Sequence, residues 1–209
     1  MIESGSDPTP TTPLPPASKR GFLRDFLETV LLAVVLFLAI NAISARVRVD
    51  GFSMRPTLDD GQYVLVSRLA TTFGTYERGD IIVFRPPMVP PESLYRRVIG
   101  MPGEEEDYIK RLIGVPGDTI RVENGSMFIN GMLLDEPYIA AAPVYTGLWE
   151  VPLGHVFVLG DNRNNSSDSH QWGLLPVENI LGRAVLVYWP FSDWMIIEHH
   201  PIALAGLQP

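Results

Sequence analysis

The chain has 209 residues, no cysteine and a formal net charge of −8, and 46% of its residues are hydrophobic. The acidic balance disfavours a nucleic-acid partner, because nucleic acids bind to basic surfaces. The absence of cysteine excludes disulfides, cysteine metal sites and a cysteine nucleophile. The length accommodates one membrane-anchored domain with a buried core.

The N-terminal region divides into two parts by composition. Residues 1–18 are rich in proline, threonine and serine and contain almost nothing that a core could bury. This composition predicts a disordered tail. A basic juxtamembrane segment, residues 19–25, follows and contains Lys19, Arg20 and Arg24.

Residues 26–44 are predicted to form a transmembrane anchor. The apolar run within it, residues 26–43, has eighteen residues, and as a helix these rise about 27 Å, which is just enough to cross the hydrocarbon core of a bilayer. A cleavable signal peptide is one alternative, because small residues surround a possible cut at Ala42-Ile43-Ser44. A buried core helix is another, although the run is apolar on all sides. The preceding basic residues favour a cytoplasmic N-terminus, and Arg46 and Arg48 after the span weaken this signal.

Residues 45–200 are predicted to form a mainly β, antiparallel domain, because short β-branched and aromatic runs alternate with turn residues. An Asn-Gly step at 124–125 lies between two alternating runs and predicts a β-hairpin. A smaller inserted β region is expected at about 119–155. Residues 86–108 are expected to form an exposed loop, and residues 201–209 a C-terminal tail.

Ser53 and Lys110 form a possible catalytic pair. A serine hydroxyl is a poor nucleophile without a nearby base. Lys110 is the one lysine after the predicted anchor, where arginine otherwise supplies the positive charge. Burial lowers the pKa of a lysine and so favours its neutral form, which can act as a base. A surface lysine at the end of a strand is the plain alternative.

A short internal similarity raises the question of which residue supplies the base. Residues 96–104 resemble residues 110–118, but the first copy begins with Arg96 and Arg97. A guanidinium stays charged in proteins, so only the second copy can provide a base. The four histidines have no familiar triad or metal-ligand spacing. No metal, nucleotide or other cofactor is expected.

Four segments in order after the predicted anchor closely resemble the sequence boxes of bacterial type I signal peptidases, a family of Ser/Lys serine proteases. They are Gly51–Leu58, Gly79–Phe84, Tyr108–Asp118 and Gly160–Gly173. The resemblance extends to about Ala184. It implies the antiparallel β-sheet catalytic domain of that family, after one N-terminal transmembrane helix.

The resemblance also implies roles for individual residues. Ser53 matches the nucleophile and Lys110 the general base that later activates water. Ser166 matches a serine that hydrogen-bonds to the lysine amine and orients it. Asp168 matches an acid that supports the architecture of the site, and Met54 matches a residue near the substrate pockets.

Gly51 departs from some members of the family. Those members carry a serine at this position, whose side chain donates a hydrogen bond to the oxyanion. The backbone N–H of Ser53 is expected to be one donor here. The second donor is open between main-chain groups, a bound water and Thr57.

The partner of Asp168 is also open. His170 stands where many members have an arginine paired with this acid. An unperturbed histidine is charged only below about pH 6.5. Asp168 is therefore expected to pair with His170 or with Arg163.

The aromatic stretch 188–197 has two interpretations. It is either a core strand or an apolar rim that rests on the membrane interface, where tryptophan is favoured.

The resemblance implies a membrane-bound serine endopeptidase that removes signal peptides from exported preproteins through an acyl-enzyme. Its partners would be signal peptides and the lipid bilayer, and it would bind no nucleic acid. It would cross the cytoplasmic membrane once, with a cytoplasmic N-terminus and the catalytic domain on the outer face. A self-cleaving Ser/Lys repressor-type protease and a catalytically silent, membrane-tethered β binding module are the alternatives.

Overall fold

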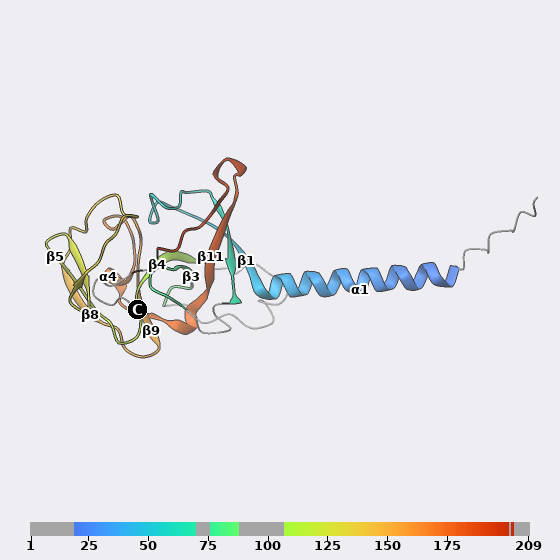
Figure 1. The fold of residues 1–209 in the computed structure, drawn as a ribbon, viewed down its shortest axis with the longest axis horizontal. Helices are drawn as coiled ribbons and strands as arrows, with labels where there is room; N and C mark the ends of the chain where they lie inside the picture. The colour runs from blue at the N-terminus through green and yellow to red at the C-terminus, as the bar shows by residue number, and fades with distance from the viewer. Residues whose placement is uncertain (1–18, 70–75, 88–106, 201, 203–209) are drawn as a thin grey trace, which may run out of the picture. The chain divides into compact units, whose positions relative to one another are not determined.

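A computed structural model describes residues 19–69, 76–87, 107–200 and 202. The tail predicted to be disordered, most of the loop predicted at 86–108 and nearly all of the predicted C-terminal tail lie outside the described residues. The first copy of the internal similarity lies outside them as well. The chain divides into two compact units, residues 1–37 and 38–209 (Figure 1).

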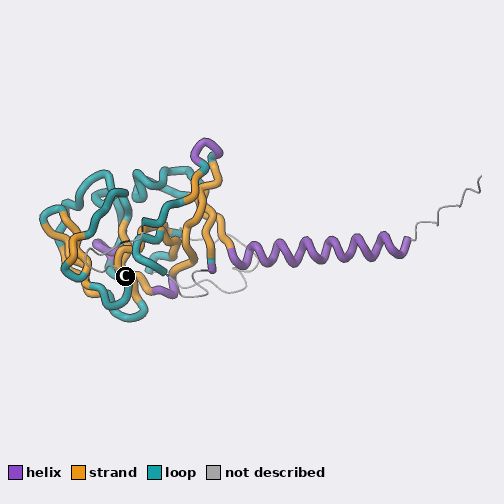
Figure 2. The backbone as a smooth tube through the Cα atoms, viewed as in Figure 1, coloured by secondary structure: helices purple, strands orange, loops and turns teal. Residues whose placement is uncertain are grey.

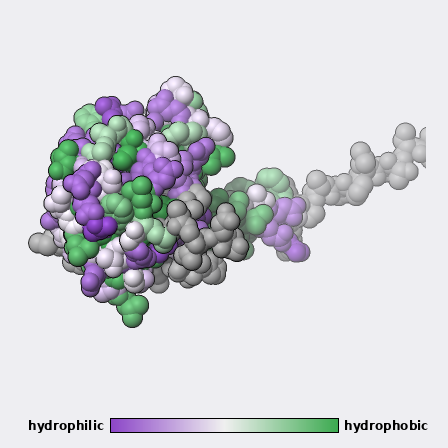
Figure 3. Space-filling model, turned by 60° about the vertical axis from the view of Figure 1, so that its left-hand side comes forward, coloured by the Kyte–Doolittle hydropathy of each residue, from purple (hydrophilic) through white to green (hydrophobic). Residues whose placement is uncertain are grey.

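Helix α1 runs from Lys19 to Ile43 and covers nearly all of the predicted anchor. Its segment Gly21–Ile43 is long enough to cross a membrane, and an 18-residue window within it has a mean hydropathy of 2.4 and is not buried. Figure 3 shows apolar side chains, in green, along this helix. The exposure argues against a buried core helix. A membrane anchor and a signal sequence both satisfy this test of length and composition.

The second unit contains an eight-stranded antiparallel sheet, drawn in orange with the other strands in Figure 2. The strand order is β1-β2-β11-β3-β4-β9-β10, and β12 pairs with β11. The strands are β1 (Ser44–Arg48), β2 (Tyr63–Ser67), β3 (Ile81–Phe84), β4 (Tyr108–Gly114), β9 (His155–Leu159), β10 (Leu175–Pro176), β11 (Ile180–Trp189) and β12 (Met195–Ile196). Three short helices follow β9: α4 (Ser169–Trp172), η1 (Val177–Asn179) and η2 (Phe191–Asp193).

A second antiparallel sheet has the order β7-β6-β5-β8. Its strands are β5 (Thr119–Glu123), β6 (Ser126–Ile129), β7 (Met132–Leu133) and β8 (Gly147–Glu150). The predicted hairpin joins β5 to β6. Both turn residues, Asn124 and Gly125, have positive φ angles, which a two-residue turn of this kind requires. The hairpin and the mainly β, antiparallel fold class are therefore confirmed.

The two sheets share a hydrophobic core. One buried cluster contains Ile120 and Val122 of the second sheet together with Ile113 of β4 and Phe157 of β9. The second sheet therefore does not have a core of its own. A second cluster lies among β1, β2, β3 and β11 around Val64, and a third contains side chains of β3, β4 and β9.

Strand β4 lies between β3 and β9 in the first sheet, and its residues from Ile109 to Gly114 are all buried. A strand buried on both faces cannot alternate between apolar and polar residues unless the polar side chains have partners. Lys110 and Arg111 break the apolar run of this strand. Both therefore need a specific structural explanation.

The aromatic stretch 188–197 forms the end of β11, helix η2 and strand β12. Ile197 is buried and Met195 packs against the first core cluster. Trp189, Phe191 and Trp194 are exposed. The stretch thus contains both core residues and an exposed aromatic surface.

Ile120→Ala is expected to lower the free energy of unfolding by about 2–5 kcal/mol, because Ile120 is fully buried in the shared core. The loss should appear in a single unfolding transition of residues 38–209. Urea denaturation followed by circular dichroism would measure it. Leu148→Ala, on the exposed face of β8, is the matched control and should change stability by less than about 0.5 kcal/mol. A separate early transition for the second sheet would contradict the shared core.

Candidate active site

Ser53 lies in a turn between β1 and β2. Gly51 has a φ of +89°, a backbone conformation that favours glycine, and its N–H donates a 2.7 Å hydrogen bond to Oδ1 of Asp60. The Met54 and Leu58 side chains are completely buried and fix the turn to the core. The resemblance implied a place for Met54 near the substrate pockets, and the structure buries its side chain completely. Its role toward a substrate stays a prediction.

Strand β4 supplies Lys110, whose Nζ lies 2.8 Å from Oγ of Ser53. The amine also donates a 3.0 Å hydrogen bond to the carbonyl oxygen of Ile109, its neighbour in the strand. The Nζ atom lies 5.4 Å from the centre of the Tyr108 ring. Lys110 is only 5% exposed, so the amine has little contact with water.

Burial lowers the pKa of Lys110 to about 8, and the negative charges of Asp168 and Asp161 oppose this effect. An ordinary lysine has a pKa near ~10.4 and is almost entirely charged at neutral pH. The site therefore makes a neutral amine accessible close to pH 8. A neutral amine within hydrogen-bond distance of a serine hydroxyl can accept its proton.

The neighbouring Arg111 is fully buried and forms a two-pronged ion pair with Asp161. Its Nε and Nη2 atoms lie 2.8 and 2.7 Å from the two carboxylate oxygens. Its Nη1 donates to the carbonyl oxygen of Gly79, and its guanidinium lies over the Tyr138 ring at 4.1 Å. Thr57 donates a 2.5 Å hydrogen bond to the same Asp161 carboxylate. This network connects β4 to the turn that carries Ser53.

Two candidate oxyanion donors already have acceptors. The Gly51 N–H donates to Asp60, and the Thr57 hydroxyl donates to Asp161. Neither is free to donate to an oxyanion in this arrangement. The Ser53 N–H, by contrast, donates a hydrogen bond to none of the described residues.

Ser166 lies close to Ser53, but its hydroxyl does not form the predicted hydrogen bond to the Lys110 amine. Ser166 is 7% exposed, and its Oγ has no hydrogen-bond partner among the described residues. A Cβ on Gly160 would overlap both Oγ of Ser166 and the carbonyl oxygen of Ser53. These two groups therefore flank Gly160, and only glycine fits there.

His170, rather than Arg163, pairs with Asp168. Nδ1 of His170 lies 2.6 Å from Oδ1 of Asp168, and the Gly160 N–H donates to Oδ2 at 2.9 Å. Arg163 instead forms a buried ion pair with Glu136. The His170 ring also stacks on Tyr145, with 4.1 Å between ring centres. Asp168 thus connects His170 to the backbone of Gly160.

The sequence reasoning gave no role to Asn162 or Glu136. Asn162 donates to the carbonyl oxygens of both Phe52 and Ser53. Glu136 comes from the loop between β7 and β8 and pairs with Arg163. Asparagine in a loop rich in Asp, Asn and Ser usually indicates a turn, which hid the first contact. No local pattern relates Glu136 to Arg163.

Among residues 19–69, 76–87 and 107–200, no group of three or more metal-ligating side chains converges on one point.

Lys110→Met is expected to stabilise the protein by up to about 3 kcal/mol at pH 7, because burial of a charged amine costs about 1.4 kcal/mol for each pKa unit. The folded-state pKa of about 8 is below the ordinary value, so the unfolded chain binds more protons between pH 8 and 10.5. Wild-type stability therefore rises with pH in this window, and the advantage of the variant shrinks. Denaturant titrations at pH 7, 9 and 10 in detergent would measure the difference.

Arg121→Met, at a side chain that is 40% exposed on β5, is the control for that experiment. Its effect on stability should not change over the same pH window, because a guanidinium stays charged throughout. A stability difference for Lys110→Met that is independent of pH would contradict the lowered pKa.

The sequence matches known proteins along most of its length. A family model described as signal peptidase, peptidase S26, matches residues 23–189. The signal peptidase I of Leptolyngbya laminosa is 42% identical over 199 residues, which cover 92% of this chain and 95% of that protein. The probable signal peptidase I-2 of a Synechocystis strain is 41% identical over 165 residues, which cover 78% of this chain and 72% of that protein.

A crystal structure of a signal peptidase I from Enterococcus faecalis is 28% identical and covers 52% of this chain and 96% of its own, with a TM-score of 0.42. The apolar helix α1 and the signal peptidase I relatives fit a membrane-anchored protein. From the extent of the sequence matches, the chain belongs to the signal peptidase I family, peptidase S26, and is a hydrolase of the serine peptidase type.

Proposed function

We propose that the protein removes N-terminal signal peptides from exported preproteins, with Ser53 as nucleophile and Lys110 as general base. The single observation that carries this proposal is the 2.8 Å distance between Ser53 Oγ and the buried Lys110 Nζ. Membership of the signal peptidase I family supports the substrate class.

In the proposed acylation step, the neutral Lys110 amine takes the Ser53 proton as Oγ attacks the scissile carbonyl carbon. The resulting oxyanion accepts a hydrogen bond from the Ser53 N–H, and such donors contribute a few kcal/mol at the transition state. The Lys110 ammonium then gives its proton to the leaving amine of the mature protein. The signal peptide remains bound to Oγ as an ester.

Deacylation repeats the same proton transfers with water. Neutral Lys110 takes a proton from a water molecule, which attacks the ester carbonyl, and the ammonium returns the proton to Oγ of Ser53. The carboxylates of Asp161 and Asp168 favour the transient ammonium, because both raise the pKa of Lys110 against the effect of burial. They therefore support the charged form of the base in each step.

The two alternative functions have less support. A repressor-type protease is disfavoured because the family match covers residues 23–189, including most of α1. A silent binding module is disfavoured because it would have no need of a lysine amine buried against a serine hydroxyl, an arrangement that costs stability.

Ser53→Ala, Lys110→Ala and Lys110→Arg are each expected to reduce preprotein cleavage by roughly 10³-fold or more, since nucleophile and base act as one unit. The arginine variant keeps the positive charge but cannot become a base. Gel analysis of a purified preprotein incubated with full-length enzyme in detergent would measure cleavage. Ser167→Ala, at an exposed serine in the same loop as Ser166, should cleave like the wild type.

The wild-type rate should rise about tenfold per pH unit below pH 8 and level off above it, because only the neutral amine is active. Persistent cleavage by both Ser53→Ala and Lys110→Ala would rule out the dyad. A wild-type protein that cleaves no preprotein would favour the binding module.

We also propose a single-pass protein of the cytoplasmic membrane, with its N-terminus in the cytoplasm and its catalytic domain on the outer face. Lys19, Arg20 and Arg24, which precede the apolar run of α1 in sequence, favour this orientation. An exposed aromatic surface supports the lipid bilayer as a partner. This aromatic surface lines a groove of about 470 Å³ and is formed by five residues: Tyr63, Tyr188, Trp189, Phe191 and Trp194. Tryptophan and tyrosine are favoured at membrane interfaces, where one end of the ring is apolar and the other is hydrated.

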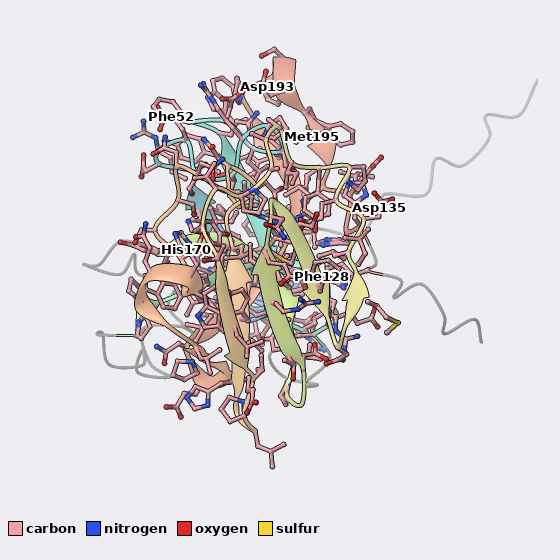
Figure 4. The ribbon with its side chains drawn as sticks, turned by 90° about the vertical axis from the view of Figure 1, so that its left-hand side faces the viewer. Phe52, Phe128, Asp135, His170, Asp193 and Met195 are labelled. Atoms are coloured by element: carbon pink, nitrogen blue, oxygen red, sulfur yellow. The ribbon has the colours of Figure 1, made fainter. Side chains whose placement is uncertain are left out.

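The aromatic surface adjoins the loop that carries Ser53. Nε2 of Gln62, in the segment that leads from this loop to β2, donates a 3.0 Å hydrogen bond to Asp193 of η2. In Figure 4, Phe52 and Asp193 lie at the same end of the domain. A membrane contact there would bring the nucleophile close to a substrate embedded in the bilayer.

A spin label on Trp194→Cys is expected to lie in the lipid interface of proteoliposomes, because Trp194 is 57% exposed on the aromatic surface. The chain has no native cysteine, so the label marks one site. The relaxation rate of the spin label should be increased more by oxygen than by a polar nickel reagent. Leu153→Cys, at a residue that is 87% exposed elsewhere, should show the opposite preference. Equal responses at both sites would contradict the membrane contact.

A further inference from the structure

The peptide bond between Phe52 and Ser53 carries two groups that matter for the site. Its N–H is the proposed oxyanion donor, and its carbonyl oxygen belongs to Phe52. A trans peptide is planar, so the N–H and C=O directions are fixed relative to each other. The cis bonds in the described chain lie elsewhere, before Pro56 and Pro190. Any group that fixes the Phe52 carbonyl therefore also fixes the direction of the Ser53 N–H.

Asn162 contacts this peptide from the loop after β9. Its side-chain Nδ2 donates a 3.1 Å hydrogen bond to the Phe52 carbonyl oxygen. Its main-chain N–H donates a 3.0 Å hydrogen bond to the Ser53 carbonyl oxygen. One residue thus contacts the carbonyl groups on both sides of the Ser53 Cα. The Arg55 N–H also donates to the Phe52 carbonyl, at 3.3 Å.

Asn162 is itself held on a rigid support. The preceding residue, Asp161, is fully buried in the ion pair with Arg111. The Asn162 carbonyl accepts a 2.9 Å hydrogen bond from the Asn165 N–H, which closes a turn. Asn162 is therefore anchored through Asp161 to Arg111 of β4, as well as to the turn that contains Ser53.

We infer that Asn162 is a positioning residue that aims the Ser53 N–H at the developing oxyanion. This inference rests on the proposed function of Ser53. Two effects act in the same direction. The hydrogen bond to the Phe52 carbonyl fixes the peptide plane, and hydrogen bonds are strongest when the donor points at the acceptor. The same bond polarises the peptide and makes its N–H a better donor.

Asn162→Ala removes the Nδ2 contact and leaves the main-chain N–H to hold Ser53. Asn162→Asp keeps the shape but places an acceptor oxygen against the Phe52 carbonyl. Asn164→Ala is the matched control. Asn164 lies in the same loop, and its amide also forms two hydrogen bonds, of 2.9 Å each, with Ala142 and Val144 instead of the Ser53 turn.

The test compares two inhibitors of the full-length enzyme in detergent that share one signal-peptide sequence. A peptide aldehyde adds to Ser53 Oγ and places an oxygen at the oxyanion position, whereas the matching peptide alcohol does not. We expect Asn162→Ala to lower kcat roughly 10- to 100-fold, since outright loss of an oxyanion donor costs about 10²- to 10³-fold. KM should change less than about threefold, as expected for an interaction made only in the transition state.

Aldehyde affinity of Asn162→Ala should fall by a factor similar to that of kcat, while alcohol affinity stays at the wild-type value. Asn162→Asp should show a larger loss of the same kind, and Asn164→Ala should show none. The rate–pH profile of Asn162→Ala should keep its rise near pH 8, because the Lys110 environment is unchanged.

Three results would overturn the inference. They are wild-type kcat in Asn162→Ala, equal weakening of the aldehyde and the alcohol, and a shifted rate–pH profile. The last two indicate that Asn162 supports the fold or the dyad instead. Ser53→Ala separates these failures from failure of the proposed function. If Ser53→Ala still cleaves, the assignment of the nucleophile is wrong, whereas an inactive Ser53→Ala with unaffected Asn162→Ala rejects only the role of Asn162.

Discussion

The burial of one amine sets the requirements for the rest of this structure. Lys110 sits in β4, and its buried surroundings remove most of the hydration that would stabilise its charge. Full burial without compensation would make the charged form inaccessible, and an amine must gain and lose a proton to act as a base. The carboxylates of Asp161 and Asp168 raise the pKa again, so that it settles at about 8. The site thus depends on a balance between loss of hydration and attraction to nearby charges, and no described carboxylate forms a direct ion pair with the amine.

The ion pair of Arg111 and Asp161 is part of this balance. Two hydrogen bonds from the guanidinium offset the charge of Asp161, which limits its attraction for the Lys110 amine. The pair also holds the segment that carries Asn162, while Thr57 connects it to the turn of Ser53. Buried ion pairs contribute little net stability, but removal of one partner is strongly destabilising. The same interaction therefore has an electrostatic role and a geometric one.

Sequence patterns predicted the β domain and the Asn124-Gly125 hairpin, because these follow from strand periodicity and turn chemistry. The pairing of Ser53 with Lys110, the one lysine after the predicted anchor, was predicted from the resemblance to type I signal peptidases. The burial of Met54 was not predictable, since a methionine beside a serine suits a pocket and a core equally. Whether His170 or Arg163 pairs with Asp168 depends on the conformation of the loop that follows β9. Asn162 was missed because its role lies in a contact with a carbonyl group 110 residues away in sequence.

The position of β11 has a consequence for the biosynthesis of this enzyme. Residues 180–189 form this strand, yet it lies between β2 and β3 in the middle of the first sheet. The strands flanking Ser53 and the strand that carries Lys110 are on opposite sides of it. A nascent chain that has extended only as far as β9 contains both members of the dyad but lacks the strand that joins their two halves of the sheet. The two halves of the first sheet are therefore joined only after residues 180–189 have been made, so the contact between Ser53 and Lys110 depends on the last long strand of the described chain.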